Sequence, residues 1–282
     1  MDMTRRFVFH GDACAFSGRI VRPVDIVLES KGSSTLPVTG GRLRSQVPRT
    51  RFGKFVRIGS SSTLAEGLFD NPKRVLAASH GRLREDELTA TTVVSAEVKD
   101  VVIGEKPVLR VRRLRASLTS KSPQASGEPF IRLSADAVIE GVKIDRYGLI
   151  VELNHTLFQR YDTHSKLRSA VDDKNFVRTH GNTLLMNTPI EGPIASPVGE
   201  LVESSGIIYA TIVKSLRWAG KPYPGAEIEH HSIKVPDFGR IFFGEIFIGR
   251  KWRRLTMMRL KLGSPMALDM ACAEIDANGT WG

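Results

Sequence analysis

The alternation of apolar and polar residues with a period of two, clearest between Thr91 and Lys121, most constrains how this chain folds. Thr91 to Ile103 (TTVVSAEVKDVVI) and Val108 to Lys121 each predict a long, half-buried β-strand. The tetrapeptide GEKP at 104–107 predicts the turn between them. We therefore expect an antiparallel hairpin to organise the first half of the chain.

The second strand of this hairpin changes phase along its length. Leu109 and Val111 are at odd-numbered positions and share one face of the strand. The next apolar residues, Leu114 and Leu118, are at even-numbered positions and would lie on the opposite face. Keeping every arginine of the strand outside then requires one extra residue near 112–113. The sequence predicts a β-bulge at that point.

The rest of the chain repeats the strand pattern with one convincing helix. Further strands are predicted at 7–14, 25–29, 52–58, 131–133, 138–144, 149–153, 207–218, 230–235, 241–248, 253–262 and 268–276. Apolar residues at helical spacing, with Asn154 as N-cap, predict the main α-helix near 155–174, and 63–79 is a weaker helical candidate. The predicted fold class is mainly β, an antiparallel sandwich or barrel-like architecture of roughly 12–15 strands.

The length and composition fit a folded protein of one or two domains. The chain has 282 residues, of which 41% are hydrophobic and 25% charged, values typical of globular proteins. Residues 187–206 hold three prolines and three glycines, which predicts a linker or a crossing loop. We expect a basic β-rich domain at 1–186 and a C-terminal β-meander at 207–282, which also fits as part of the same domain.

Two sequence features indicate the cellular compartment of the protein: its two cysteines and a short apolar run at the N-terminus. Cys14 and Cys272 are too few for a disulfide framework. His10 and Asp12 interrupt the apolar run that follows Arg5 and Arg6, so it does not resemble a signal peptide. No stretch approaches the length of a membrane span. We therefore expect a cytoplasmic protein with no membrane partner.

The formal net charge of +11 is concentrated in the first half of the chain. Residues 1–150 carry 25 of the 41 basic residues and 16 of the 30 acidic ones. Two clusters of basic residues dominate. The first consists of Arg42, Arg44, Arg49, Arg51, Lys54 and Arg57. The second consists of Arg110, Arg112, Arg113 and Arg115. Such clusters attract phosphate-rich partners through counterion release. The alternatives are a solvated basic face, or one that contacts an acidic face of another copy.

The catalytic candidates are weak. His10, Asp12 and Cys14 share one face of a strand, but the strand rise places His10 and Cys14 about 13 Å apart, beyond hydrogen-bond reach. In this hypothesis, either His80 or His164 joins His10, Asp12 and Cys14 through the fold. The competing interpretation is a buried cysteine beside an ordinary strand histidine.

Motifs for metal or cofactor binding are missing from the sequence. There is no HExxH, paired CxxC, GxGxxG or Walker sequence. We expect no metal and no cofactor.

The strand at 241–248 is apolar on both faces and therefore needs cover on both. An intramolecular core is the first interpretation, and a partner subunit is the alternative because aromatic residues are enriched at interfaces. The candidate interface residues are Phe238, Phe242, Phe243, Phe247 and Trp252.

These observations favour a non-enzymatic, intracellular, β-rich protein that works by binding or self-association through a basic N-terminal face. A protein partner or a second copy is the first expectation. One alternative is a nucleic-acid-binding protein that uses the clusters at 42–57 and 110–115. The other is a hydrolase with a dispersed His/Asp/Cys site; whether the protein is an enzyme stays open.

Overall fold

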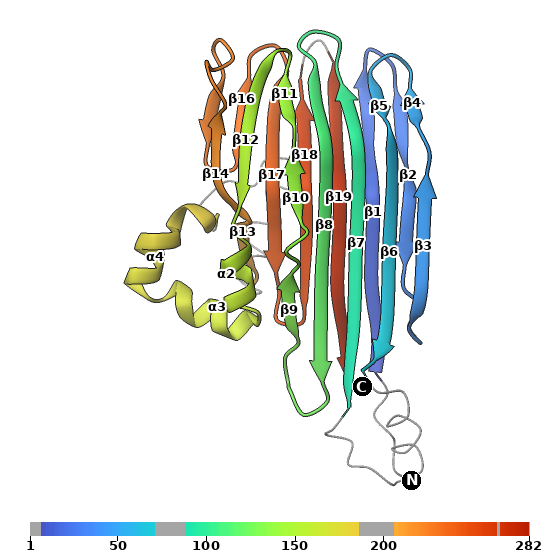
Figure 1. Ribbon diagram of the computed structural model, residues 1–282, viewed down its shortest axis with the longest axis vertical. Coiled ribbons are helices and arrows are strands. Elements are labelled where there is room, and N and C mark those ends of the chain that lie inside the picture. The colour runs from blue at the N-terminus through green and yellow to red at the C-terminus, as the bar shows by residue number, and fades with distance from the viewer. Residues whose placement is uncertain (1–6, 71–87, 186–205, 264–265, 282) are drawn as a thin grey trace.

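The computed structural model describes residues 7–70, 88–185, 206–263 and 266–281, which form two antiparallel sheets (Figure 1). Seven strands of sheet A follow one another in the spatial order β15 (Glu227–Glu229), β16 (Ser232–Val235), β17 (Gly239–Ile248), β18 (Trp252–Leu262), β19 (Ala267–Trp281), β1 (Phe7–Arg22) and β2 (Ile26–Thr35). An eighth strand, β13 (Ile208–Thr211), also pairs with β17. The last strand of the chain thus lies beside the first.

Sheet B has 11 strands built around the long hairpin of β7 (Thr89–Ile103) and β8 (Leu109–Pro123). On the β7 side lie β6 (Ser60–Phe69), β3 (Gly41–Val47), β5 (Val56–Ile58) and β4 (Thr50–Phe52). On the β8 side lie β9 (Phe130–Leu133), β10 (Val138–Glu140), β11 (Val142–Ile144), β12 (Tyr147–Leu153) and β14 (Val213–Trp218). The hairpin is where the alternation of the sequence places it.

The two sheets pack face to face as a β-sandwich, as predicted, with β1 and β19 against β7 and β8. One main hydrophobic core runs between them and includes Phe9, Phe16, Leu114 and Phe243. The described residues form 19 strands, more than expected, because several predicted strands are divided. The predicted strand at 207–218, for example, leaves sheet A after β13 and enters sheet B as β14.

The β7–β8 pairing corrects the predicted bulge. The register stays constant from Thr89↔Pro123 to Ile103↔Leu109, so no extra residue is inserted. The change of phase is real, but β7 makes the same change at Asp100, opposite Arg112, where φ is +52°. The prediction was wrong because it assumed that the partner strand keeps its phase.

A matched change of phase also crosses sheet A. The inward residues of β17 shift from Ile241 and Phe243 to Ile246 and Ile248 around Gly244, which has φ +61°. The paired positions in the next strands, which lie in one line across the sheet, are Met257, Ala273 (φ +52°), Ala15 and Gly32 (φ +69°). Each sheet therefore has a transverse line at which its strands exchange inner and outer faces together; we call it the crease.

The predicted helix is three short ones: α2 (His155–Arg160), α3 (His164–Val171) and α4 (Lys174–His180). Asn154 does cap α2, since its side chain accepts a hydrogen bond from the N–H of Leu157. The break follows at Asp162, a buried carboxylate that accepts hydrogen bonds from Arg132 and Lys166. Burial by itself would raise the pKa of Asp162, but these two partners lower it overall.

The weaker helical prediction at 63–79 was wrong over its described part. Thr63 to Phe69 belong to β6, which pairs with β3 on one side and β7 on the other. The rest of that prediction lies at 71–87, outside the described residues, and so does most of the predicted linker at 187–206.

Candidate functional site

A row of four cations crosses the outer face of sheet B from β4 to β11. The register aligns Arg51 with Arg57, Arg57 with Val102, Val102 with Arg110, and Arg110 with Lys143. Residues paired in this way share a face of the sheet. We call these four residues, Arg51, Arg57, Arg110 and Lys143, the cation row.

The alternation of each strand turns the cation row outward. Val56 and Ile58 are buried on either side of Arg57, and Leu109 and Val111 are buried on either side of Arg110. Four steps between strands, at about 4.8 Å each, give the row a span of about 19 Å. Three of its cations are exposed and Arg57 is half-buried.

The cation row is free of carboxylate partners within the described part of the chain. The ion pairs found there involve none of its four members, although Lys54 nearby pairs with Glu105 at 2.8 Å. Arg51 and Arg57 even oppose one another directly across β4 and β5. Like charges placed opposite each other destabilise a sheet, so packing within the fold does not account for this arrangement.

The other basic residues predicted from the sequence divide into two groups. Five have an acidic partner, in the pairs Arg42–Glu66, Lys54–Glu105, Arg112–Glu140, Arg113–Glu97 and Arg115–Asp136. Arg44 and Arg49 have none among the described residues. The sequence cluster at 110–115 is therefore mostly neutralised by the fold, and the unpaired charge lies toward β3, β4 and β5.

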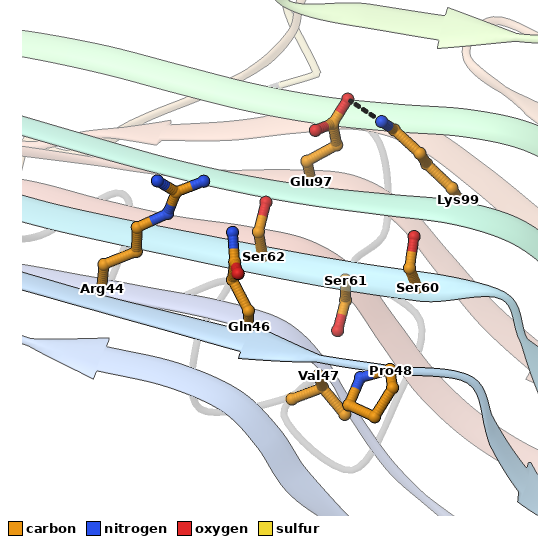
Figure 2. Close-up of a pocket in the computed structure, with 9 residues that line it drawn as sticks. All are labelled: Arg44, Gln46, Val47, Pro48, Ser60, Ser61, Ser62, Glu97 and Lys99. Carbon is orange, nitrogen blue, oxygen red and sulfur yellow. Dashed lines mark ion pairs between the residues drawn. The ribbon is translucent and has the colours of Figure 1, made fainter.

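A hollow of about 590 Å³ opens beside the cation row, between β3, β6 and β7. Figure 2 shows Arg44 and Gln46 rising from β3, Ser60 and Ser62 from β6, and Glu97 and Lys99 from β7. The register sets Gln46 beside Ser62 and Ser62 beside Glu97, with Lys99 beside Ser60. Val47, Pro48 and Ser61 complete the lining.

The proposed catalytic residues do not converge. On β1, His10 Nε2 lies 3.1 Å from Asp12 Oδ2, and both side chains are exposed. His164 lies instead in α3, beside β9 and away from β1 (Figure 1), where its Nε2 is 2.7 Å from the carbonyl oxygen of Gly206. His80 lies outside the described residues.

Cys14 is poorly suited to be a nucleophile. Its thiol lies 3.2 Å from Ser30 Oγ, and burial raises its pKa despite that contact. The second thiol, Cys272, is fully buried, and burial raises its pKa as well. Neither thiol is primed for reaction at neutral pH.

The structure reveals a buried charged group that the sequence analysis missed. Glu245 in β17 receives two hydrogen bonds from Arg259, at 2.7 and 2.8 Å, and a third from the hydroxyl of Tyr209. His231 Nε2 lies 3.6 Å from the same carboxylate. The available signal was one carboxylate inside a strand apolar on both faces, because a buried charge needs partners.

Glu245 and Tyr209 keep their protonation states near neutral pH. Burial alone would raise the pKa of Glu245, but the hydrogen bonds and charge of Arg259, with His231 beside it, lower it to about 2. Burial and the Glu245 charge raise the pKa of Tyr209. Glu245 thus stays ionised and Tyr209 stays protonated near neutral pH, which suits a structural ion pair joining β13, β17 and β18.

The candidate interface aromatics have different environments. Phe243 is fully buried in the core between the sheets, and Phe238 is buried near one end of it. Phe242 is buried under the guanidinium of Arg259, which lies 3.9 Å from the ring centre. Phe247 stacks on Tyr209 and, like Trp252, is half-buried.

Within the described ranges, no group of three or more His, Cys, Asp and Glu side chains is placed to hold a metal ion. The helices of the same ranges include none long and apolar enough to cross a membrane.

Comparison with known proteins adds a family but no activity. No curated protein matches the chain. Two solved structures aligned with it are outer membrane phospholipase A from Escherichia coli and an active-site mutant of that protein. The first is 7% identical over 96% of this chain and 97% of that chain, with a TM-score of 0.17. The second is 8% identical over 99% and 93%, with a TM-score of 0.14. Scores this low carry no inference.

A family model, in contrast, matches residues 7–249, most of the chain. The chain therefore belongs to the family described as a domain of unknown function, DUF8256.

Proposed function

We propose that this protein is a non-enzymatic binding protein whose outer sheet B face holds the phosphate backbone of a nucleic acid. The observation that carries the proposal is the cation row, four aligned cations with no carboxylate partner among the described residues. Repulsion within an unpaired row of this kind destabilises the folded protein. A bound anion removes that repulsion and so stabilises the complex.

The shape of the surface supports a phosphate backbone. One strand of a DNA duplex carries a phosphate every 3.4 Å of helix axis, so about five or six phosphates pass along the 19 Å span of the row. The row itself has no aromatic residue, which fits contact with phosphates and not stacking on bases. We therefore expect binding that depends little on base sequence.

The same surface disfavours self-association through this face. A two-fold interface sets the same patch of each copy against the other, and the cation rows would then oppose one another. An acidic protein is the remaining partner class.

The test is the salt dependence of binding to a short fluorescent DNA duplex, followed by anisotropy. Four phosphates neutralised predict a slope of about −3.6 for log K against log salt concentration. A flexible acidic polypeptide, poly-glutamate, is the comparison probe. Binding of poly-glutamate without binding of the duplex would replace nucleic acid by an acidic protein partner, and binding of neither would refute the proposal.

A further inference from the structure

The hollow between β3, β6 and β7 is distinct from the cation row and has different chemistry. Its outer wall carries two cations, Arg44 and Lys99, on opposite sides of the hydroxyls of Ser60 and Ser62 and the amide of Gln46. We propose that it binds one phosphate monoester group, with Arg44 and Lys99 as the charge partners. This inference rests on the proposed function and specifies a further feature of the partner.

The donors of the hollow match an oxyanion with several oxygens. A guanidinium offers two parallel N–H groups to one phosphate, and an ammonium acts as a point charge. Hydroxyl and amide groups supply neutral donors between them. A monoester phosphate carries up to two negative charges near neutral pH, twice the charge of a backbone phosphate, and therefore gains more from two cations at one place.

Glu97 is the carboxylate in this lining, and its charge is already compensated. Arg113 Nε lies 2.6 Å from Glu97 Oε1, and Arg115 Nη1 lies 3.8 Å from the other oxygen. Lys99 Nζ forms an ion pair with the same oxygen, Glu97 Oε1, at 3.6 Å (Figure 2), which is longer than a hydrogen bond, so its ammonium keeps donors for a ligand. With Asp136 on Arg115 counted as well, the group of charges around the hollow stays positive.

The volume of the hollow also fits a ligand larger than one phosphate. About 590 Å³ lies within the range of small-molecule sites, which runs from about 300 to 1,000 Å³. Serine hydroxyls, an amide and a carboxylate are suitable partners for the sugar hydroxyls next to a phosphate. The monoester then comes either from the phosphorylated end of a nucleic acid strand or from a free phosphorylated small molecule.

Two measurements distinguish these sources. The first compares binding of one single-stranded oligonucleotide carrying either a 5′-phosphate or a 5′-hydroxyl. The second compares the thermal midpoint of the protein in inorganic phosphate and in chloride at equal ionic strength, since a ligand that binds the folded state raises the midpoint.

The variants are Arg44→Gln alone and Arg44→Gln with Lys99→Gln. Arg42→Gln is the matched control, because Arg42 lies two residues away on the same face of β3 and pairs with Glu66 instead of lining the hollow. We expect the 5′-phosphate to improve affinity by about tenfold in the native protein and in the control. The double variant should lose this preference and the phosphate-dependent rise in midpoint.

The outcomes separate the hollow from the cation row. Oligonucleotide binding with no preference for the 5′-phosphate, and no midpoint shift, would refute the proposal that the hollow binds a phosphate monoester. The proposed function would then still stand. A midpoint shift that needs Arg44 and Lys99, without binding of either the oligonucleotide or the DNA duplex, would support the hollow as a site for a free phosphorylated molecule and refute the proposed function.

Discussion

Removing half of the cation row should change salt dependence by a calculable amount. The perturbation is Arg51→Gln with Arg57→Gln, which takes away two of four aligned cations and the like-charge pair between β4 and β5. At about 0.9 per phosphate, the expected slope of log K against log salt falls from about −3.6 to about −1.8. Between 50 and 200 mM salt, the native protein should then lose about 150-fold in affinity and the variant about 12-fold.

Stability should move in the opposite direction from binding. Relieving a like-charge pair directly across two strands stabilises a sheet by about 0.2–1 kcal/mol, and the exposure of Arg51 places this pair toward the low end. Urea denaturation should therefore show a free energy of unfolding that is equal to or slightly above that of the native protein. A marked loss of stability would show that these arginines have a structural role.

The matched control removes the same charge from sheet A. Lys234 and Lys261 are exposed cations that lie on either side of Arg240 in the register, with Glu227 and Asp269 aligned on their other sides. Lys234→Gln with Lys261→Gln should leave the slope near −3.6. If both double variants flatten the slope equally, net charge and not the cation row governs binding, and the reasoning fails.

Further measurements test the core, the buried ion pair and the thiol. Phe243→Ala should cost about 3–5 kcal/mol of unfolding free energy in urea, and a near-neutral value would contradict its place in the core. Because the pKa of Glu245 is lowered to about 2, its stabilisation is present above about pH 4.3 and lost as pH falls toward 2. Glu245→Gln should thus destabilise most above pH 5, and a pH-independent difference would refute this. Burial raises the pKa of Asp276, so its carboxylate opposes folding, and Asp276→Asn should raise the thermal midpoint at pH 7 but not below about pH 4. The raised pKa of Cys14 predicts slower alkylation at pH 8 than for free cysteine, and faster alkylation would restore it as a candidate nucleophile.

Local pattern predicted the strands well where each depends on its own residues. The hairpin predicted at Thr91–Ile103 and Val108–Lys121 is β7 and β8 within two residues at either end. Pairing between distant strands leaves no local signal, so neither the contact of β1 with β19 nor the division of 207–218 between two sheets could be predicted. The matched phase change at Asp100 was missed for the same reason, since it belongs to a pair of strands.

The candidate site shows the same division. Arg51, Arg57 and Arg110 were identified from clusters along the chain, but Lys143 stands apart in sequence and joins them only through the register of β8 and β11. Arg112 and Arg113 looked equivalent to Arg110, and only the fold shows that Glu140 and Glu97 neutralise them. Sequence reports where charge is abundant, whereas pairing decides which charges stay available.

The crease of sheet B determines which residues on either side of it face outward. Arg57 and Ser60 are separated by three residues, and so are Val102 and Lys99, yet all four face outward. In an uninterrupted strand, an odd separation places two side chains on opposite faces. The crease, which passes through Gly59 and Asp100, is what allows the cation row and the hollow to share one surface. If β7 kept its length but ran through Asp100 as a regular extended strand, Val102 and Lys99 would lie on opposite faces, and the two surfaces would part at β7.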